Sequence, residues 1–232
     1  MIKKHQLRFF ISLIFCLIGS SVLAEDITKD SIDYASVERR KQVYQGTHLN
    51  LDIFNPIATA WRDGRFEGSL SVDVDLWHRL FPTAEFGFMT ADIKHEDYKY
   101  ETIGLFAKLG ADYNFINFKS DRKYDHSFYA GLRYGYSYTK YSLTDAVLNN
   151  DYWDESGKYA NLNQVSNFGW FEVVVGVRVQ IYKNFFMSVA MQVKTFGHFY
   201  EDTPCYPTYI SGYGKYGEDV NFGLNYSLSY RF

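Results

Sequence analysis

The amino-acid sequence predicts an all-β protein, a closed eight-stranded antiparallel transmembrane β-barrel of the outer-membrane type. Apolar and polar side chains alternate over long segments, and the last one, 220–232, exceeds the roughly 9 to 11 residues that a tilted strand needs to cross a bilayer. Aromatic residues make up 19% of the chain, yet no segment after residue 24 offers the run of about 18 apolar residues typical of a membrane helix. Short and long connections also alternate along the chain, as in outer-membrane barrels.

The first 24 residues are predicted to be a signal peptide. Lys3, Lys4 and Arg8 form a basic start, an apolar run covers 9–18, and small residues precede the expected cleavage after Ala24. Their removal would leave 21 of the 24 basic residues against 27 acidic ones. This acidic balance argues against a nucleic-acid partner.

The mature chain is predicted to begin with a periplasmic N-terminal tail, residues 25–45, which is polar and shows no sustained periodicity. Residues 46–232 are predicted to form the barrel. Cys205 is the one cysteine left after removal of the signal peptide, so we expect no internal disulfide.

Four strands are predicted in the first half of the barrel. Segment 47–54 alternates Leu and Ile with His, Asn and Asp, and ends at an Asn-Pro pair because proline cannot donate to a strand ladder. Segment 66–77 alternates Phe, Leu and Val with Glu, Ser and Asp. A short strand, 84–88, follows the tight link WHRLFP, and 100–113 is the fourth.

Four more strands follow in the second half. Segment 126–139 alternates Tyr, Leu and Phe with Gly, Ser and Arg. Segments 170–182 and 185–196 are predicted to form a hairpin about Lys183-Asn184, and 220–232 closes the barrel. The connections after strands two, four and six are roughly 5, 12 and 3 residues long, against roughly 10, 8, 29 and 21 for the others, which predicts short turns on one rim and long loops on the other.

The apolar face of these strands is predicted to point outward to lipid. An eight-stranded barrel has an interior just wide enough for side chains to fill, and the apolar face carries side chains too bulky for that space. The polar face is rich in Gly, Ser and Ala beside isolated charges. A soluble, lipocalin-like barrel with the apolar face inside is the alternative.

The charged residues of the polar face are predicted to share the lumen as a structural network that holds the strands in register. A narrow conducting channel is the alternative interpretation. The network is predicted to comprise Asp52, Glu67, Asp73, Asp75, Glu85, Lys108, Asp112, Arg133, Glu172, Arg178, Lys194, Asp219 and Arg231.

The seventh connection is rich in tyrosine and glycine, a composition that suits recognition of an extracellular protein or glycan because rigid rings give a large contact area. The alternative is that these rings fold down and close the barrel. The candidate ligand-contact residues are Tyr200, Tyr206, Tyr209, Tyr213 and Tyr216.

The sequence gives little support for catalysis or metal binding. A lipid-modifying enzyme of the outer membrane would need a His with a Ser and a carboxylate near the outer rim. The candidates are His95, followed by two acidic residues, and His198, with Glu201, Asp202 and Ser211, and neither set forms a signature. No metal-binding motif appears, so we expect no enzyme activity, no metal and no cofactor.

Several segments resemble an uncharacterised family of Bacteroidota outer-membrane β-barrel proteins, classed as a domain of unknown function. They are IGLFAKLGADYN, FYAGLRYGYSYT, WFEVVVGVRVQIYKNFFMSVAMQVK and YISGYGKYGEDVNFGLNYSLSY. The resemblance spans Gly46 to Tyr230 and implies an architecture similar to small OmpA- and OmpX-type barrels, without an activity or a catalytic residue. Ser211 stands where members often have proline.

The predicted location is therefore the cell outer membrane of a Gram-negative bacterium, reached by export through the signal peptide. The expected partners are outer-membrane lipid, the outer-membrane assembly machinery and an extracellular protein or glycan. The terminal Phe232 resembles the signal by which that machinery recognises barrels.

Overall fold

The computed structural model describes the barrel and parts of its connections. The predicted signal peptide and most of the predicted tail lie outside the described residues. The first strand begins at Tyr44, slightly before the predicted barrel boundary. The described residues are 43–60, 64–94, 99–116, 125–144, 146–150, 155–159, 162–200, 206–217 and 220–232.

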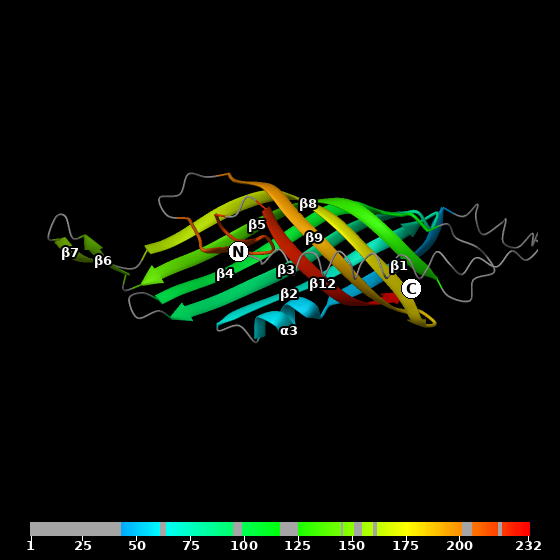
Figure 1. Cartoon of the computed structure of the whole chain (residues 1–232), viewed down its shortest axis with the longest axis horizontal. Helices are drawn as coiled ribbons and strands as arrows, with labels where there is room; N and C mark the ends of the chain where they lie inside the picture. Colours follow the sequence, from blue (N-terminus) through cyan, green and yellow to red (C-terminus); the bar gives the residue numbers. More distant parts are fainter. Residues whose placement is uncertain are drawn as a thin grey trace, which may run out of the picture. The chain divides into compact units, whose positions relative to one another are not determined.

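Within these ranges, eight antiparallel strands close a barrel in the order β1-β12-β9-β8-β5-β4-β3-β2 (Figure 1). Each lies next to its neighbour in the chain, and β1 closes the sheet by pairing with β12. The predicted fold class and all eight predicted strands are confirmed. The strands are β1 (Tyr44–Asp52), β2 (Arg65–Leu76), β3 (Leu80–Lys94), β4 (Lys99–Asn114), β5 (His126–Thr144), β8 (Leu162–Tyr182), β9 (Phe185–Phe199) and β12 (Val220–Arg231).

Two tight turns lie on the rim that we call the turn rim. Trp77 and His78 both have φ of 55°, and the N–H of Arg79 donates to the carbonyl of Leu76 at 3.0 Å. Positive φ at both central residues is typical of the hairpin turns that match strand twist. The predicted hairpin about Lys183-Asn184 is confirmed. The opposite rim, which carries the connections after β1, β3, β5 and β9, is called the loop rim.

Some of the predicted strands were too short. The link predicted to run through Pro82 is only a turn, because Leu80, Phe81 and Pro82 already pair with β4 as part of β3. The fifth connection, predicted as a loop, contains the paired strands β6 (Ala146–Asn150) and β7 (Glu155–Tyr159). The seventh contains β10 (Tyr209–Ile210) and β11 (Gly214–Lys215).

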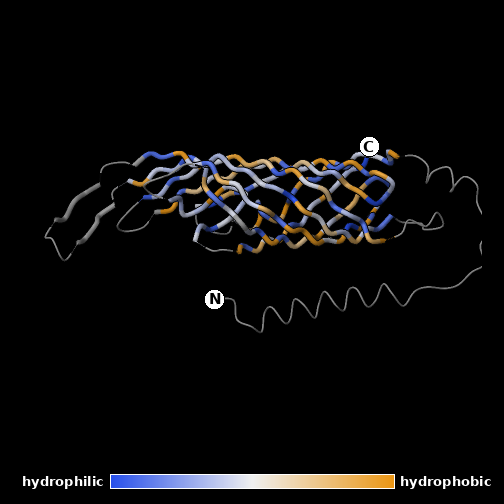
Figure 2. Tube along the Cα trace, turned by 90° about the horizontal axis from the view of Figure 1, so that it is seen from above, coloured by the Kyte–Doolittle hydropathy of each residue, from blue (hydrophilic) through white to orange (hydrophobic). Residues whose placement is uncertain are grey.

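The apolar face points outward, as predicted. Val175 and Leu224 are exposed, whereas Asp73 and Glu172 are each only 1% exposed. Figure 2 shows the alternation as hydrophobic and hydrophilic residues following each other along the strands. The barrel therefore has the outer-membrane type of surface. No helix among the described residues is long and apolar enough to span a membrane.

A short helix, α3 (Phe54–Ala60), follows β1, where only the end of a strand was predicted. The Asp52 carboxylate accepts hydrogen bonds from the backbone N–H groups of Phe54 (3.0 Å) and Asn55 (3.5 Å), which have no partner inside the helix. Pro56 fits the first turn because its missing N–H needs no partner there.

The lumen also holds large aromatic rings, whereas only small and ionic residues were predicted inside. Trp170 is fully buried and lies directly opposite Gly135, where an added Cβ would be 2.3 Å from the indole ring. Phe106 faces Gly87 in the same way, at 2.2 Å. The glycines of the polar face thus make room for rings from the neighbouring strand. The buried aromatic residues on the barrel strands are Phe81, Tyr100, Phe106, Tyr129, Tyr141, Phe168, Trp170 and Phe186.

An arginine placed on the outer face tests whether the apolar face of the strands points to lipid. Val175→Arg should lower the free energy of unfolding from lipid vesicles by roughly 2 to 4 kcal/mol, because the charge would face hydrocarbon near the midplane. Tyr182→Arg, at the turn rim on the same strand, should cost only about 0 to 1 kcal/mol. Urea titration in vesicles measures both. Equal costs at the two positions would contradict a lipid-facing Val175.

Candidate functional site

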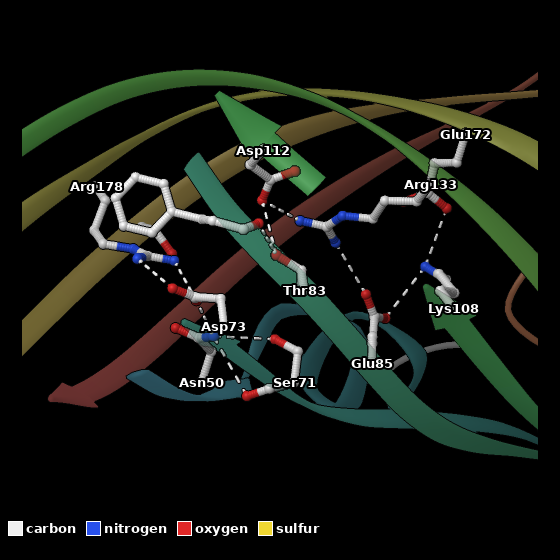
Figure 3. A network of polar contacts seen from close by, with 12 residues as sticks. Asn50, Ser71, Asp73, Thr83, Glu85, Lys108, Asp112, Arg133, Glu172 and Arg178 are labelled. Atoms are coloured by element: carbon white, nitrogen blue, oxygen red, sulfur yellow. Dashed lines mark hydrogen bonds and ion pairs between the residues drawn. The ribbon is translucent and has the colours of Figure 1, made fainter. Parts of the chain in front are cut away.

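The half of the lumen nearer the turn rim holds a group of polar side chains that we call the Asp73 cluster (Figure 3). Arg178 of β8 reaches Asp73 of β2 with two hydrogen bonds of 3.0 and 2.7 Å. His48 Nδ1 lies 2.9 Å from the same carboxylate, and Asn50 Nδ2 donates to it at 2.8 Å. The cluster therefore joins β1, β2 and β8 across the barrel.

A second group, the Glu85 cluster, links β3, β4, β5 and β8 (Figure 3). Glu85 pairs with Lys108 at 3.2 Å and with Arg133 at 3.1 Å. Arg133 also pairs with Asp112 at 2.8 Å, and Lys108 with Glu172 at 3.1 Å. Each cation thus bridges two carboxylates in a buried environment, where unpaired charges would be very costly.

These clusters leave little open space. A cavity of about 20 Å³ lies between them, lined by Asn50, Asp73, Glu85, Arg133 and Arg178 among others. A volume of this size holds a water molecule or two. The geometry favours a network that holds the strands in register over a conducting channel.

The other predicted lumen residues have different partners. Asp52 caps α3, Asp75 lies 2.8 Å from His78, and Glu67 pairs with Arg65 at 2.6 Å. Lys194 donates to the carbonyl of Gly212 at 2.7 Å. Arg231 pairs with Asp125 at 2.7 Å, in a partly exposed position. Asp219 lies outside the described residues.

The loop-rim end of the lumen is filled by residues 206–217, which we call the mouth hairpin. It contains β10 and β11, with Ile210 and Ser211 fully buried and Tyr213 only 4% exposed. The mouth hairpin lies very close to the barrel wall, because a Cβ at Gly104 of β4 would lie 2.0 Å from Ser211 Oγ.

Hydrogen bonds from several strands hold the mouth hairpin. Besides the bond from Lys194 of β9, Asn221 of β12 donates to the carbonyl of Lys215 at 3.1 Å. The N–H of Thr208 donates to the Tyr100 hydroxyl of β4 at 3.1 Å. Contacts with β4, β9 and β12 therefore hold the mouth hairpin in the loop-rim end of the lumen.

Aromatic rings in mutual contact run from the buried mouth to the surface, and we call them the aromatic column. Its inner ring centroids lie 4.8 Å apart between Phe168 and Tyr213 and between Phe168 and Phe199. Tyr206 lies 4.9 Å from Phe199 and 5.0 Å from Tyr216. The column consists of Trp170, Tyr213, Phe168, Phe199, Tyr206 and Tyr216.

The five predicted ligand-contact tyrosines do not form one surface. Tyr206 and Tyr216 are exposed at the outer end of the aromatic column, whereas Tyr213 is buried within it. Tyr209 is half-buried, with the Arg65 guanidinium 4.9 Å from its ring centre. Tyr200 is exposed and hydrogen-bonds to the outward-facing Tyr134. Tyr213 is thus folded into the mouth, as the alternative prediction for this loop has it, whereas ligand contact by the exposed rings stays a prediction.

The structure separates the described members of the predicted catalytic sets. His198 is exposed beside Tyr200, with ring centres 4.5 Å apart, whereas Ser211 is fully buried in the mouth hairpin. His95, Glu96, Asp97, Glu201 and Asp202 lie outside the described residues. In the part of the chain that the structure describes, no group of three or more His, Cys, Asp or Glu side chains could hold a metal ion.

Sequence reasoning missed the aromatic column. A signal was present, because glycines on the lumen face leave space that larger side chains must fill in a close-packed interior. Gly135 of β5, for example, faces Trp170 of the column across the β5–β8 pair. Finding these partners requires the strand register, which the alternation pattern does not give.

Comparisons with known proteins identify a family and list solved structures to which the chain is similar. The family model described as "Domain of unknown function (DUF6048)" matches residues 6–232. Neisserial surface protein A is 14% identical, with a TM-score of 0.38, covering 82% of this chain and 96% of that chain. Ail, the attachment invasion locus protein of Yersinia pestis, is 11% identical, with a TM-score of 0.37, covering 81% of this chain and 94% of that chain. A structure of Ail with the heparin analogue sucrose octasulfate has a TM-score of 0.40 at the same identity and coverage. No curated protein matches the chain.

Breaking the buried Asp73 pair should be costly. Arg178→Met leaves Asp73 without its bidentate partner and should lower the free energy of unfolding by about 3 to 5 kcal/mol. Asp73→Asn in the same chain should recover more than half of the loss, because the unpaired charge is then removed. Denaturant unfolding in micelles measures both variants.

Arg231→Met is the matched control, because the pair of Arg231 with Asp125 is partly exposed and should contribute at most about 1 kcal/mol. Equal losses for Arg178→Met and Arg231→Met would contradict a structural role for the Asp73 cluster.

Proposed function

Because the chain belongs to the family described as a domain of unknown function (DUF6048), which supplies no activity, we propose from its geometry that it is an outer-membrane barrel with a surface-interaction role. Its outer face, with exposed Val175 and Leu224, suits contact with outer-membrane lipid, and the predicted signal peptide suits export. In this proposal the loop rim faces the outside of the cell and the turn rim faces the periplasm. Lipid and the outer-membrane assembly machinery are then obligatory partners.

The observation that carries the proposal is the exposed end of the aromatic column. Tyr206 is 49% exposed and Tyr216 is 36% exposed, although each packs against Phe199. Rings held in place by buried neighbours lose little conformational entropy when they bind a partner, which favours recognition of a protein or glycan.

A narrow channel is the second candidate, and the packed lumen disfavours it. The two charged clusters and the mouth hairpin block the lumen at successive levels, with a cavity of about 20 Å³ between the clusters. A lipid-modifying enzyme is the third candidate. His198 is exposed whereas Ser211 is buried in the mouth hairpin, which disfavours a catalytic pair formed by these two residues.

The surface-interaction proposal predicts that Tyr206→Ala with Tyr216→Ala will weaken binding to whole cells or to glycan arrays. Truncation of two central aromatic contacts should cost 2 kcal/mol or more, roughly a 30-fold loss of affinity. These substitutions leave Ile210 and Ser211 in the mouth, so they test binding more cleanly than deletion of the loop. Unchanged binding would count against the proposal.

Tyr113→Ala is the matched control, because it removes an exposed tyrosine at the turn rim. It should leave binding unchanged, and all variants should keep heat-modifiable gel migration.

Planar-bilayer recordings test the channel alternative. The purified protein should show no steady conductance, because paired charges and packed side chains fill its lumen. A steady current that changes in Arg133→Ala or Glu172→Ala would contradict the proposal and indicate a channel.

An assay of lipid modification tests the enzyme alternative. Lipid modification that disappears in His198→Ala would contradict the proposal and indicate an enzyme.

A further inference from the structure

Between β2 and β12, strand β1 forms only part of the barrel wall. β1 pairs with β12 only from His48↔Arg231 to Asp52↔Ser227. It pairs with β2 only as far as Leu51↔Leu70. Nearer the loop rim, segment 65–69 of β2 and segment 220–226 of β12 have no β1 strand between them.

Helix α3 occupies this part of the wall, and Figure 1 shows it beside β2. It contacts both β2 and β12. The N–H of Glu67 donates to Thr59 Oγ1 at 3.1 Å, and just before the helix the N–H of Ile53 donates to the carbonyl of Tyr226 at 2.9 Å. Among the residues that the structure describes here, single hydrogen bonds therefore join this segment to β2 and β12, whereas continuous ladders join the other strands.

The helix has little stability of its own. Its sequence, FNPIATA, contains no charged residue and includes β-branched Ile57 and Thr59 and an asparagine, which are weak helix formers. A helix of seven residues is far shorter than an isolated helix that is stable in water. Its position therefore depends on contacts such as that of Pro56 with Gly68, where an added Cβ would lie 3.8 Å from the proline ring.

The lumen cavity lies behind the junction of β1 and α3. Its lining includes Asp52 at the end of β1, Ser69 of β2, and Asn225 and Ser227 of β12. These residues border the part of the wall that α3 completes. The lining is polar and the volume holds a water molecule or two, so the cavity suits water and does not suit an acyl chain.

We propose that α3 is a hinged section of the barrel wall that opens a lateral passage between the lumen cavity and the surrounding lipid, for small polar groups. Opening breaks the few side-chain and backbone bonds of α3 and leaves the ladders of β2 with β3 and of β12 with β9 intact. The passage is independent of the surface-interaction role, because it uses neither Tyr206 nor Tyr216.

Hydrogen exchange with a removable lock tests the hinge. In a Cys205→Ser background, Pro56→Cys with Gly68→Cys places two thiols at the contact between α3 and β2, where a Cβ at Gly68 would lie 3.8 Å from Pro56 Cγ, and we expect these thiols to form a disulfide. Before locking, the amides of Ile53 and Glu67, whose hydrogen bonds cross this part of the wall, should exchange at least about tenfold faster than the β4 and β5 amides. The lock should slow exchange at Glu67, and reduction should restore it.

A lock on another seam, Leu105→Cys with Tyr138→Cys between β4 and β5, is the matched control and should leave exchange near α3 unchanged. The proposal is overturned if the amides near α3 exchange as slowly as those of β4 and β5. It is also overturned if the disulfide between positions 56 and 68 forms but does not slow exchange at Glu67. The same holds if the folded double-cysteine variant cannot form that disulfide.

Thiol labelling tests the passage itself. Ser227→Cys, a buried position that lines the cavity near α3, should react with a small methanethiosulfonate reagent at least about tenfold faster than Ser137→Cys, an equally buried position on the lumen side of β5. Both side chains are buried in the lumen of the closed barrel, so static exposure does not favour either one. Equal labelling rates would overturn the lateral route, and Ser188→Cys replaces Ser227→Cys if that variant does not fold.

Discussion

The narrow interior of an eight-stranded barrel is the constraint on which the rest of this structure depends. Such a wall encloses a space that only side chains can fill. The chain fills it in two ways, with paired charges in the middle and with aromatic rings nearer the loop rim. Lys108 and Arg133 each bridge two carboxylates, while Trp170 and Phe168 pack beneath the mouth hairpin. The same packing that closes the lumen also holds the exposed rings of Tyr206 and Tyr216 in place.

Alternation of side chains was enough to predict the strands, the outward apolar face and the buried charges, because a lipid-exposed strand imposes period 2 on almost every residue. It could not predict which charges pair, since Asp73 and Arg178 are far apart in the chain and meet only across the closed barrel. Asp52 was expected in the charge network, but its carboxylate caps α3. The helix itself was missed because seven residues with weak helix propensity give no periodic signal.

The tyrosines of the seventh connection show where composition stops being informative. The same residue type lies in four environments between residues 200 and 213: buried at Tyr213, beside a guanidinium at Tyr209, against the outer wall at Tyr200, and exposed at Tyr206. Burial of Ile210 and Ser211 pulls the hairpin into the mouth and decides which rings remain outside. Local sequence cannot specify this, because the contacts come from β4, β9 and β12.

The glycine and aromatic pairs of the lumen have an evolutionary consequence. Gly135 and Trp170 share one volume, as do Gly87 and Phe106. A side chain gained at either glycine would require a smaller ring at its partner, so the two members of a pair cannot drift independently. Among related chains these positions should therefore change together, and such correlated changes would reveal the strand register without a structure.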